Sequence, residues 1–234
     1  TIQSVITQTI NFEENLQLIL INNATTDNAG DICVKYRDLY PDNVKYIELN
    51  ENIGVSGARN KGIDAAGADI ISFLDSDDKW TEDGIEIAYN FFMQHYEEVD
   101  FVASRTRKFD AEDGYIGVDY KFDAGTRIVD IMEEPNAKQF VVTASLIKTV
   151  AARRHRFDER LRRAEDVKMI NEILLDSHKY GIVKESLYLY RIRTLGGGSN
   201  VQTLHNHRNW YIDAVKYCYL DLIDESKEKY ELGI

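Results

Sequence analysis

Residues 69–78 read Asp69-Ile-Ile-Ser-Phe-Leu-Asp-Ser-Asp-Asp78, an apolar run that ends in a cluster of acids. The run combines β-branched and aromatic side chains, which predicts a short strand buried on both faces. Asp75, Asp77 and Asp78 follow it, and like charges this close repel unless a divalent cation lies among them. Ligands of open α/β sheets bind beyond the carboxyl ends of the strands. The pattern indicates either a cation-dependent ligand site or a solvated acidic turn.

Strand-like and helix-like segments alternate on both sides of this run. The predicted strands cover 16–21, 44–49 and 99–104, and the predicted helices cover 29–40, 56–66 and 82–96. Ser56 is the expected N-cap of the second of these helices. Such β-α-β alternation predicts an α/β fold with a mostly parallel, Rossmann-like sheet flanked by helices.

The pattern changes after residue 104, where Asp113-Gly114 is typical of a hairpin turn and a helix is expected over 166–178. This change predicts a smaller mixed region beside the parallel sheet. The predicted organisation is a first half at 1–104, a second half at 105–200, and a C-terminal helical tail or linker at 201–234.

Composition limits the class of protein. The chain has 234 residues, 44% of them hydrophobic, which is enough for a sizeable core. Its net charge of −12 argues against a nucleic-acid partner, because phosphate backbones require a basic face. Only two cysteines are present, no apolar run reaches the length of a membrane span, and no signal peptide is recognisable. We therefore expect a cytoplasmic chain.

Several short motifs occur together in one order along the chain. They are Ser4-Val-Ile-Thr-Gln-Thr9, Asn22-Asn-Ala-Thr-Thr-Asp27, Asn52-Ile-Gly-Val-Ser-Gly-Ala-Arg-Asn-Lys-Gly62, Phe73-Leu-Asp-Ser-Asp-Asp78, Phe157-Asp-Glu159, Glu165-Asp166 and Tyr190-Arg191. The ordered set resembles the family 2 glycosyltransferases, which have the GT-A fold. The resemblance implies transfer of a sugar, with inversion, from a nucleotide-sugar donor to an acceptor hydroxyl.

The resemblance also assigns a donor site. Asp77 would be the main ligand of Mn²⁺ or Mg²⁺, with Asp75 near the ribose or a metal-bound water. A hard cation prefers carboxylate oxygens and neutralises a diphosphate leaving group. The other residues implied at the nucleotide are Asn23, Asn52, Arg59, Asn60 and Ser76. Asn23 stands where the family usually has an aspartate, so the nucleobase contact is altered, and Arg59 could instead be an ordinary surface residue of a helix.

Glu165-Asp166 precedes a predicted helix. In the family the aspartate of this pair is the general base, which makes Asp166 the implied catalytic residue. A carboxylate suits that task because it is ionised at neutral pH and can lie within hydrogen-bond reach of a sugar hydroxyl. The alternative is an acidic pair that only stabilises the helix N-terminus through its dipole.

Cationic and histidine residues suggest further contacts. Arg162 and Arg163 belong to a basic cluster that could receive an anionic acceptor, or could simply form a solvated face that balances nearby acids. Arg191 could reach the diphosphate or pair with surface acids. His205 or His207 would be an additional metal ligand if the C-terminal segment folded over the site; otherwise both are surface residues.

The resemblance leads to a specific functional expectation. It is an inverting, metal-dependent glycosyltransferase that takes a sugar, most readily from a UDP-sugar, to a glycan or lipid-linked acceptor of the cell surface. Peripheral association with the inner face of the membrane would fit such an acceptor. The family normally begins with a strand that precedes Thr1, so we expect this chain to be a trimmed form of a longer one. The competing hypotheses are a non-catalytic nucleotide- or glycan-binding domain of a larger polymerase, and a nucleotidyltransferase, although no glycine-rich basic loop supports the latter.

Overall fold

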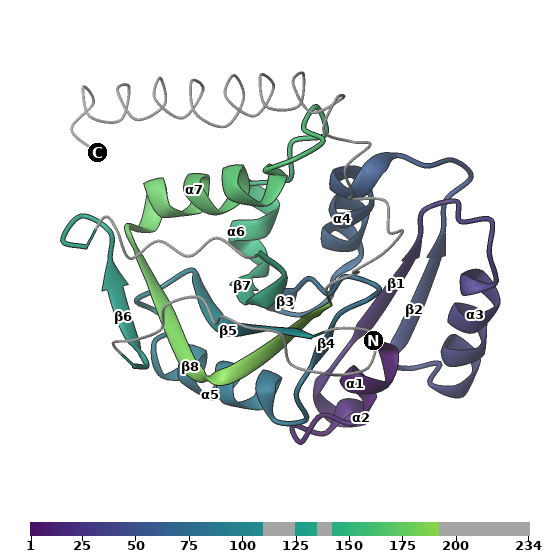
Figure 1. Cartoon of the computed structure of the whole chain (residues 1–234), viewed down its shortest axis with the longest axis horizontal. Helices are drawn as coiled ribbons and strands as arrows, with labels where there is room; N and C mark the ends of the chain where they lie inside the picture. Colours follow the sequence, from purple (N-terminus) through teal and green to yellow (C-terminus); the bar gives the residue numbers. More distant parts are fainter. Residues whose placement is uncertain (110–124, 135–141, 192–234) are drawn as a thin grey trace.

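A computed structural model describes residues 1–109, 125–134 and 142–191 of the chain (Figure 1). The elements, in chain order, are α1 (Ile2–Ile6), α2 (Phe12–Asn15), β1 (Leu18–Asn22), α3 (Ala29–Leu39), β2 (Val44–Glu48), α4 (Gly54–Ala65), β3 (Ile70–Ser72), β4 (Lys79–Trp80), α5 (Gly84–Gln94), β5 (Phe101–Phe109), β6 (Arg127–Asp130), a 3₁₀ turn (Val142–Ala144), β7 (Ser145–Lys148), α6 (Thr149–Arg154), α7 (Glu165–Ser177) and β8 (Lys179–Arg191). The predicted α/β class is confirmed.

The strands form two sheets. β1 and β2 pair in parallel, with α3 as the crossover between them, as the alternation predicted. The larger sheet has the order β3-β7-β5-β8-β4, and β6 pairs with β8 outside this path. Only the β5–β8 pair of the larger sheet is parallel; its other described pairs are antiparallel.

The prediction of a mostly parallel sheet is therefore wrong for the larger sheet, and topology supplies the reason. β3 and β5 both run antiparallel to β7, so they point the same way, as their β-α-β connection requires. β7 comes from later in the chain and lies between them. Apolar periodicity reports that a strand is buried, and it does not report which strand is the neighbour or which way that neighbour runs.

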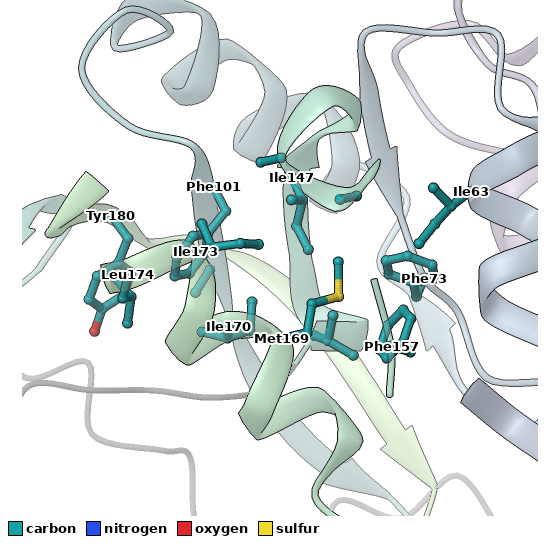
Figure 2. Packing of buried hydrophobic residues seen from close by; sticks show 14 of the residues in the cluster. Ile63, Phe73, Phe101, Ile147, Phe157, Met169, Ile170, Ile173, Leu174 and Tyr180 are labelled. Carbon is teal, nitrogen blue, oxygen red and sulfur yellow. The ribbon is translucent and has the colours of Figure 1, made fainter. Parts of the chain in front are cut away.

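Helices cover both faces of the larger sheet. Figure 1 shows α5 on one side and α6 and α7 on the other. Ala88 and Phe92 of α5 pack with Val102 and Val183 in one core cluster. The second, larger cluster lies beneath α7 and is shown in Figure 2, where Met169 and Phe157 approach Phe73 and Ile63 of α4. This cluster joins α4, the end of β3 and α7 in one apolar contact, and so positions the residues described below.

Local boundaries differ from the sequence predictions in three places. α4 begins at Gly54, after Ile53, so Ser56 lies inside the helix and is not its cap. α7 runs from Glu165 to Ser177, one residue earlier at each end than the predicted 166–178, and His178, in the left-handed conformation, is its C-cap. The predicted boundary between 104 and 105 falls inside β5, at a shift in its register with β8.

Two of the predicted features cannot be compared with the structure. The turn at 113–114 and the segment 201–234, with His205 and His207, lie outside the described residues. Within the residues that are described, no helix has both the length and the apolar composition needed to cross a bilayer.

Candidate functional site

The acidic cluster forms the loop between β3 and β4. Asp78 is buried, with 1% of its surface exposed, and its carboxylate accepts hydrogen bonds from the Tyr188 hydroxyl (2.7 Å) and the Arg191 backbone N–H (2.8 Å). Burial raises the pKa of Asp78 to about 6, and the negative charges of Asp75 and Asp77 add to the rise. The cluster is therefore not a solvated turn, because one of its acids anchors the loop to β8.

Arg191 braces the same loop with its side chain. Its Nε donates to the carbonyl oxygen of Asp77 at 2.9 Å, and its guanidinium lies 4.3 Å from the centre of the Phe109 ring. The ring of Phe109 is almost completely buried. Arg191 thus lies beside the acidic loop and orients the backbone of Asp77.

Arg59 of α4 joins two acids that are far apart in the sequence. Its Nη2 lies 3.0 Å from Asp75 Oδ1, and its Nη1 lies 2.9 Å from Glu165 Oε1. Burial alone would lower the pKa of Arg59, but the two carboxylates outweigh that effect and raise it. Arg59 is therefore not a surface residue: it links the acidic loop to the start of α7.

Asn60 follows Arg59 and fixes the segment that supports it. Its Nδ2 donates to the Phe157 carbonyl oxygen and to Glu159 Oε1, both at 2.9 Å, while its Oδ1 accepts the Phe157 N–H at 3.0 Å. Asn60 is 4% exposed. Both of its amide hydrogens are used inside the chain, so the structure gives Asn60 a packing role rather than the predicted contact with a nucleotide.

Asp166 lies in the first turn of α7, directly after Glu165. Burial raises the pKa of Asp166 and the charge of Glu165 raises it further, whereas the Val167 N–H and Arg59 act in the opposite direction. This environment moves the carboxyl toward the range in which a carboxylate is a stronger proton acceptor. The predicted base and the predicted metal motif are thus brought to one region, linked by Arg59.

Asn23 and Asn52 brace each other at the end of β1. Asn23 donates to Asn52 Oδ1 (3.1 Å) and to the Gly54 carbonyl oxygen (3.2 Å), and its Oδ1 accepts the Ile53 N–H (2.9 Å). Gly54 has a φ of +79°, which strongly favours glycine. Asn23 therefore holds the loop that precedes α4.

The basic cluster is mostly paired with acids. Arg156 contacts Asp64, Arg154 and His155 contact Asp176, and Arg160 contacts Asp158. Arg162 differs, because it is exposed and its Nη1 would lie 3.5 Å from a Cβ added at Gly54, close to the start of α4. Arg163 precedes α7 and is half-buried. The solvated-face interpretation holds for much of the cluster, and Arg162 lies beside the loop that precedes α4.

Metal binding would depend on Asp75 and Asp77. Among the described residues, no three His, Cys, Asp or Glu side chains converge into a ready-made site. Mg²⁺ and related cations are commonly held by one or two carboxylates, with the other ligands supplied by substrate phosphates and water. The Asp75 side chain is 41% exposed. Two hard oxygen donors on one short loop fit a cation of this kind when a diphosphate completes its ligands.

Sequence reasoning missed the structural roles of Glu165 and Tyr188. The sequence marks Glu165 only as the neighbour of Asp166, and its place beside the proposed base is the one local signal for its role. Tyr188 is separated from Asp78 by 110 positions, and nothing in its local pattern distinguishes it from other buried strand residues. An open depression lined by Pro41, Asp42 and Val44 lies at the start of β2, at the opposite end of that strand from this site.

Comparison with known proteins identifies the family. Residues 1–163 match the family model described as Glycosyl transferase family 2. The chain belongs to the family 2 glycosyltransferases. Its similarity to the Bacillus subtilis minor teichoic acid biosynthesis proteins is also clear: it is 39% identical to GgaB over 95% of this chain and 24% of that protein, and 31% identical to GgaA over 99% of this chain and 52% of that protein. The glycosyltransferase chain thus spans about a quarter of one relative and about half of the other.

Solved glycosyltransferase structures confirm the GT-A fold. S. aureus TarS 1–349 in complex with UDP-GlcNAc has a TM-score of 0.73 at 18% identity, covering 92% of this chain and 62% of that one. The complex of the same protein with UDP has a TM-score of 0.70 at 20% identity, covering 82% of this chain and 55% of that one. At this identity the likeness establishes the fold.

Proposed function

We propose that this glycosyltransferase transfers a sugar, with inversion, from a UDP-sugar to a hydroxyl of a teichoic-acid-type acceptor, with a divalent cation bound at Asp75 and Asp77. The single observation that carries the proposal is the bridge made by Arg59. It brings the acidic loop that ends β3 and the first turn of α7 into one site, although Asp75 and Glu165 are far apart in the chain.

The chemistry follows from this arrangement. The acceptor oxygen forms a bond to the anomeric carbon as the bond from that carbon to the diphosphate oxygen breaks, and Asp166 takes the proton of the acceptor hydroxyl. Attack from the side opposite the leaving group inverts the configuration. The partly buried position of Asp166 supports this role, because burial raises the pKa of its carboxyl and so increases the basicity of the carboxylate.

The acidic loop would act on the leaving group. Asp77 and Asp75 would hold Mn²⁺ or Mg²⁺, which when bound supplies positive charge to the departing diphosphate. Arg191 holds the Asp77 backbone, and buried Asp78 fixes the loop to β8, so both residues orient these ligands. A loop positioned in this way does not have to reorganise during the reaction.

The donor and acceptor classes are inferred from relatives. The S. aureus structures contain UDP and UDP-GlcNAc, and the Bacillus relatives are named for minor teichoic acid biosynthesis. Teichoic acids carry phosphodiesters, and exposed Arg162 beside the start of α4 would favour such an anionic acceptor over a neutral one. Catalysis on the inner face of the membrane belongs to the same proposal.

Two variants test the roles. We expect Asp77→Ala to abolish cation-dependent binding of UDP, measured by calorimetry with Mn²⁺. Asp166→Asn should bind UDP as the wild type does and lose transfer by about 100-fold or more, in the range seen when a general base is removed. Near-normal transfer by Asp166→Asn would refute the base assignment. Binding of UDP by the wild type without turnover of any UDP-sugar, with a teichoic-acid-type acceptor present, would instead support a non-catalytic domain of a larger protein.

A further inference from the structure

The Arg59–Glu165 ion pair is shielded from water, whereas Asp75, the other partner of Arg59, has a side chain that is 41% exposed. The side chains of Arg59 and Glu165 are each 13% exposed, whereas the pair that Asp64 of the same helix α4 makes with Arg156 has side chains that are 53% and 40% exposed. Exposed pairs contribute little, and a partly buried charge that loses its partner carries a large penalty. The Arg59–Glu165 contact is therefore a fixed part of the site.

The guanidinium geometry explains why an arginine is needed here. One terminal nitrogen contacts Asp75 and the other contacts Glu165, so the two carboxylates lie at opposite prongs of one planar group. A lysine ammonium would carry the same charge as a single point and could not hold two acids in a fixed relative orientation. The bridge therefore fixes the relative orientation of the Asp75 and Glu165 carboxylates and also balances their negative charge.

The plane of this guanidinium is itself supported. The Arg59 guanidinium carbon lies 5.2 Å from the centre of the Phe157 ring, and Phe157 contacts Phe73 at a centroid distance of 5.0 Å. Asn60 holds the Phe157 backbone from both sides. Two consecutive residues of α4 thus build the bridge and its platform.

The bridge ends one residue from the proposed base. Glu165 and Asp166 both lie in the first turn of α7, so fixing the Glu165 side chain limits how that turn can rotate or shift. At its other end the bridge holds Asp75, in the loop proposed to bind the cation and the donor. One side chain therefore connects the donor side of the site to the acceptor side.

We infer that Glu165 is a positioning residue, which acts through Arg59 to hold Asp75 and the first turn of α7 in the relative orientation that transfer requires. The inference rests on the proposed function. It assigns Glu165 no contact with donor or acceptor. Displacements of about 1 Å can reduce a rate about 100-fold, so a residue of this kind changes kcat much more than donor affinity.

The test compares three variants, Glu165→Ala, Glu165→Gln and Arg59→Lys, with a matched control. The control is Asp64→Asn, which removes an exposed acid from α4, the helix that carries Arg59. We would measure UDP affinity with Mn²⁺ by calorimetry. Steady-state UDP release would be followed with an acceptor and whichever UDP-sugar the wild type turns over fastest. We expect Glu165→Ala and Arg59→Lys to lower kcat about 100-fold, with donor KM within about threefold of the wild type. Glu165→Gln keeps the shape of the side chain and one oxygen that can accept a hydrogen bond from Arg59, so its kcat should fall by only about 10-fold.

The double variant decides whether the two residues act as one unit. Residues that act through each other are not additive, so Arg59→Lys combined with Glu165→Ala should be no slower than the worse single variant. A multiplicative loss would overturn the inference, as would a near-normal kcat for Glu165→Ala or a raised donor KM with unchanged kcat. Should Glu165→Ala unfold, Glu165→Gln carries the same test. If the wild type turns over no UDP-sugar, the proposed function itself is refuted. If the wild type is active and the variants are unaffected, only the positioning role of Glu165 is refuted.

Discussion

The hydroxyl of Tyr188 donates a 2.7 Å hydrogen bond to the carboxylate of Asp78, and both side chains are buried. The contact joins the C-terminal part of β8 to the loop that carries Asp75 and Asp77. Burial raises the pKa of Tyr188, and the charge of Asp78 raises it further, so the phenol remains a donor throughout the physiological range. The position of the acidic loop thus depends on a residue more than 100 positions away.

The first prediction concerns this hydrogen bond. Tyr188→Phe should destabilise the protein by about 1–3 kcal/mol, because the buried carboxylate of Asp78 loses a donor while the ring is kept. The measurement is the free energy of unfolding in urea at pH 7. Tyr190→Phe, which removes a hydroxyl from an exposed tyrosine of the same strand, is the control and should change it by less than about 0.5 kcal/mol. Equal effects from the two changes would contradict the role of Tyr188.

The second prediction is a pH dependence of stability. The pKa of Asp78 is raised from 3.8 to about 6 in the folded state, so the folded protein binds this proton more tightly than the unfolded chain. Protonation of Asp78 therefore stabilises the folded protein below pH 4, and this stabilisation is lost as the pH rises toward 6. Asp78→Asn should remove that loss, so its stability relative to the wild type should increase between pH 4 and pH 7, by an amount on the order of 3 kcal/mol. Urea titrations in EDTA, which excludes bound cations, would show it; parallel curves for the two proteins would contradict it.

The third prediction tests the close packing of β8 against α5. A Cβ added at Gly181 would lie 2.7 Å from Phe91 Cε1 and 2.7 Å from Val102 Cγ1. Gly181→Ala should therefore cost about 1–3 kcal/mol through overpacking. Gly62→Ala is the matched control, because no atom lies within 4 Å of its added Cβ and the residue is inside α4. It should stabilise the protein by about 0.4–1 kcal/mol, since alanine loses less backbone entropy in a helix. The same sign for both changes in a thermal unfolding experiment would refute this account.

Asn60 provides the fourth prediction. Asn60→Ala removes three hydrogen bonds to the Phe157–Glu159 segment, and one N–H and one carbonyl of buried Phe157 lose their partner. We expect a loss of roughly 2–4 kcal/mol in the free energy of unfolding. Lys61→Ala, at the exposed neighbouring position, should be near neutral. A cost below about 1 kcal/mol for Asn60→Ala would show that the segment holds itself without this residue.

Local pattern was sufficient for much of the fold. The apolar runs at β1, β2 and β5 and the periodic segments at α3, α4, α5 and α7 predicted elements that the structure contains. The strand order of the larger sheet was not predictable in the same way, because β7 joins β3 and β5 from a distant part of the chain. Periodicity records which faces are buried, whereas partner choice is settled by tertiary packing.

The same distinction applies to the site. The motifs located Asp75, Asp77 and Asp166 as the candidate residues, and the structure brings these regions together. It also shows that the Asn60 amide is buried against the Phe157 backbone and that the Asn23 amide holds the loop before α4, which no one-dimensional pattern reveals. The bridge through Arg59 is visible only in the folded structure, since ion pairs between distant residues leave no local signal in one sequence.

The fifth prediction uses the opposite effects of two neighbours on Asp166. Because the proposed base acts when ionised, transfer should fall as the pH drops through its raised pKa, and this acid limb should lie above the usual aspartate value of 3.8. Glu165 raises that pKa and Arg59 lowers it. Glu165→Gln should therefore move the acid limb of kcat to lower pH, and Arg59→Gln should move it to higher pH. The residual activity of each variant, followed as UDP release from pH 4 to pH 8, would give the two limbs. Asp64→Asn should leave the limb in place, and shifts of the same sign for both neighbours would show that Asp166 does not control it.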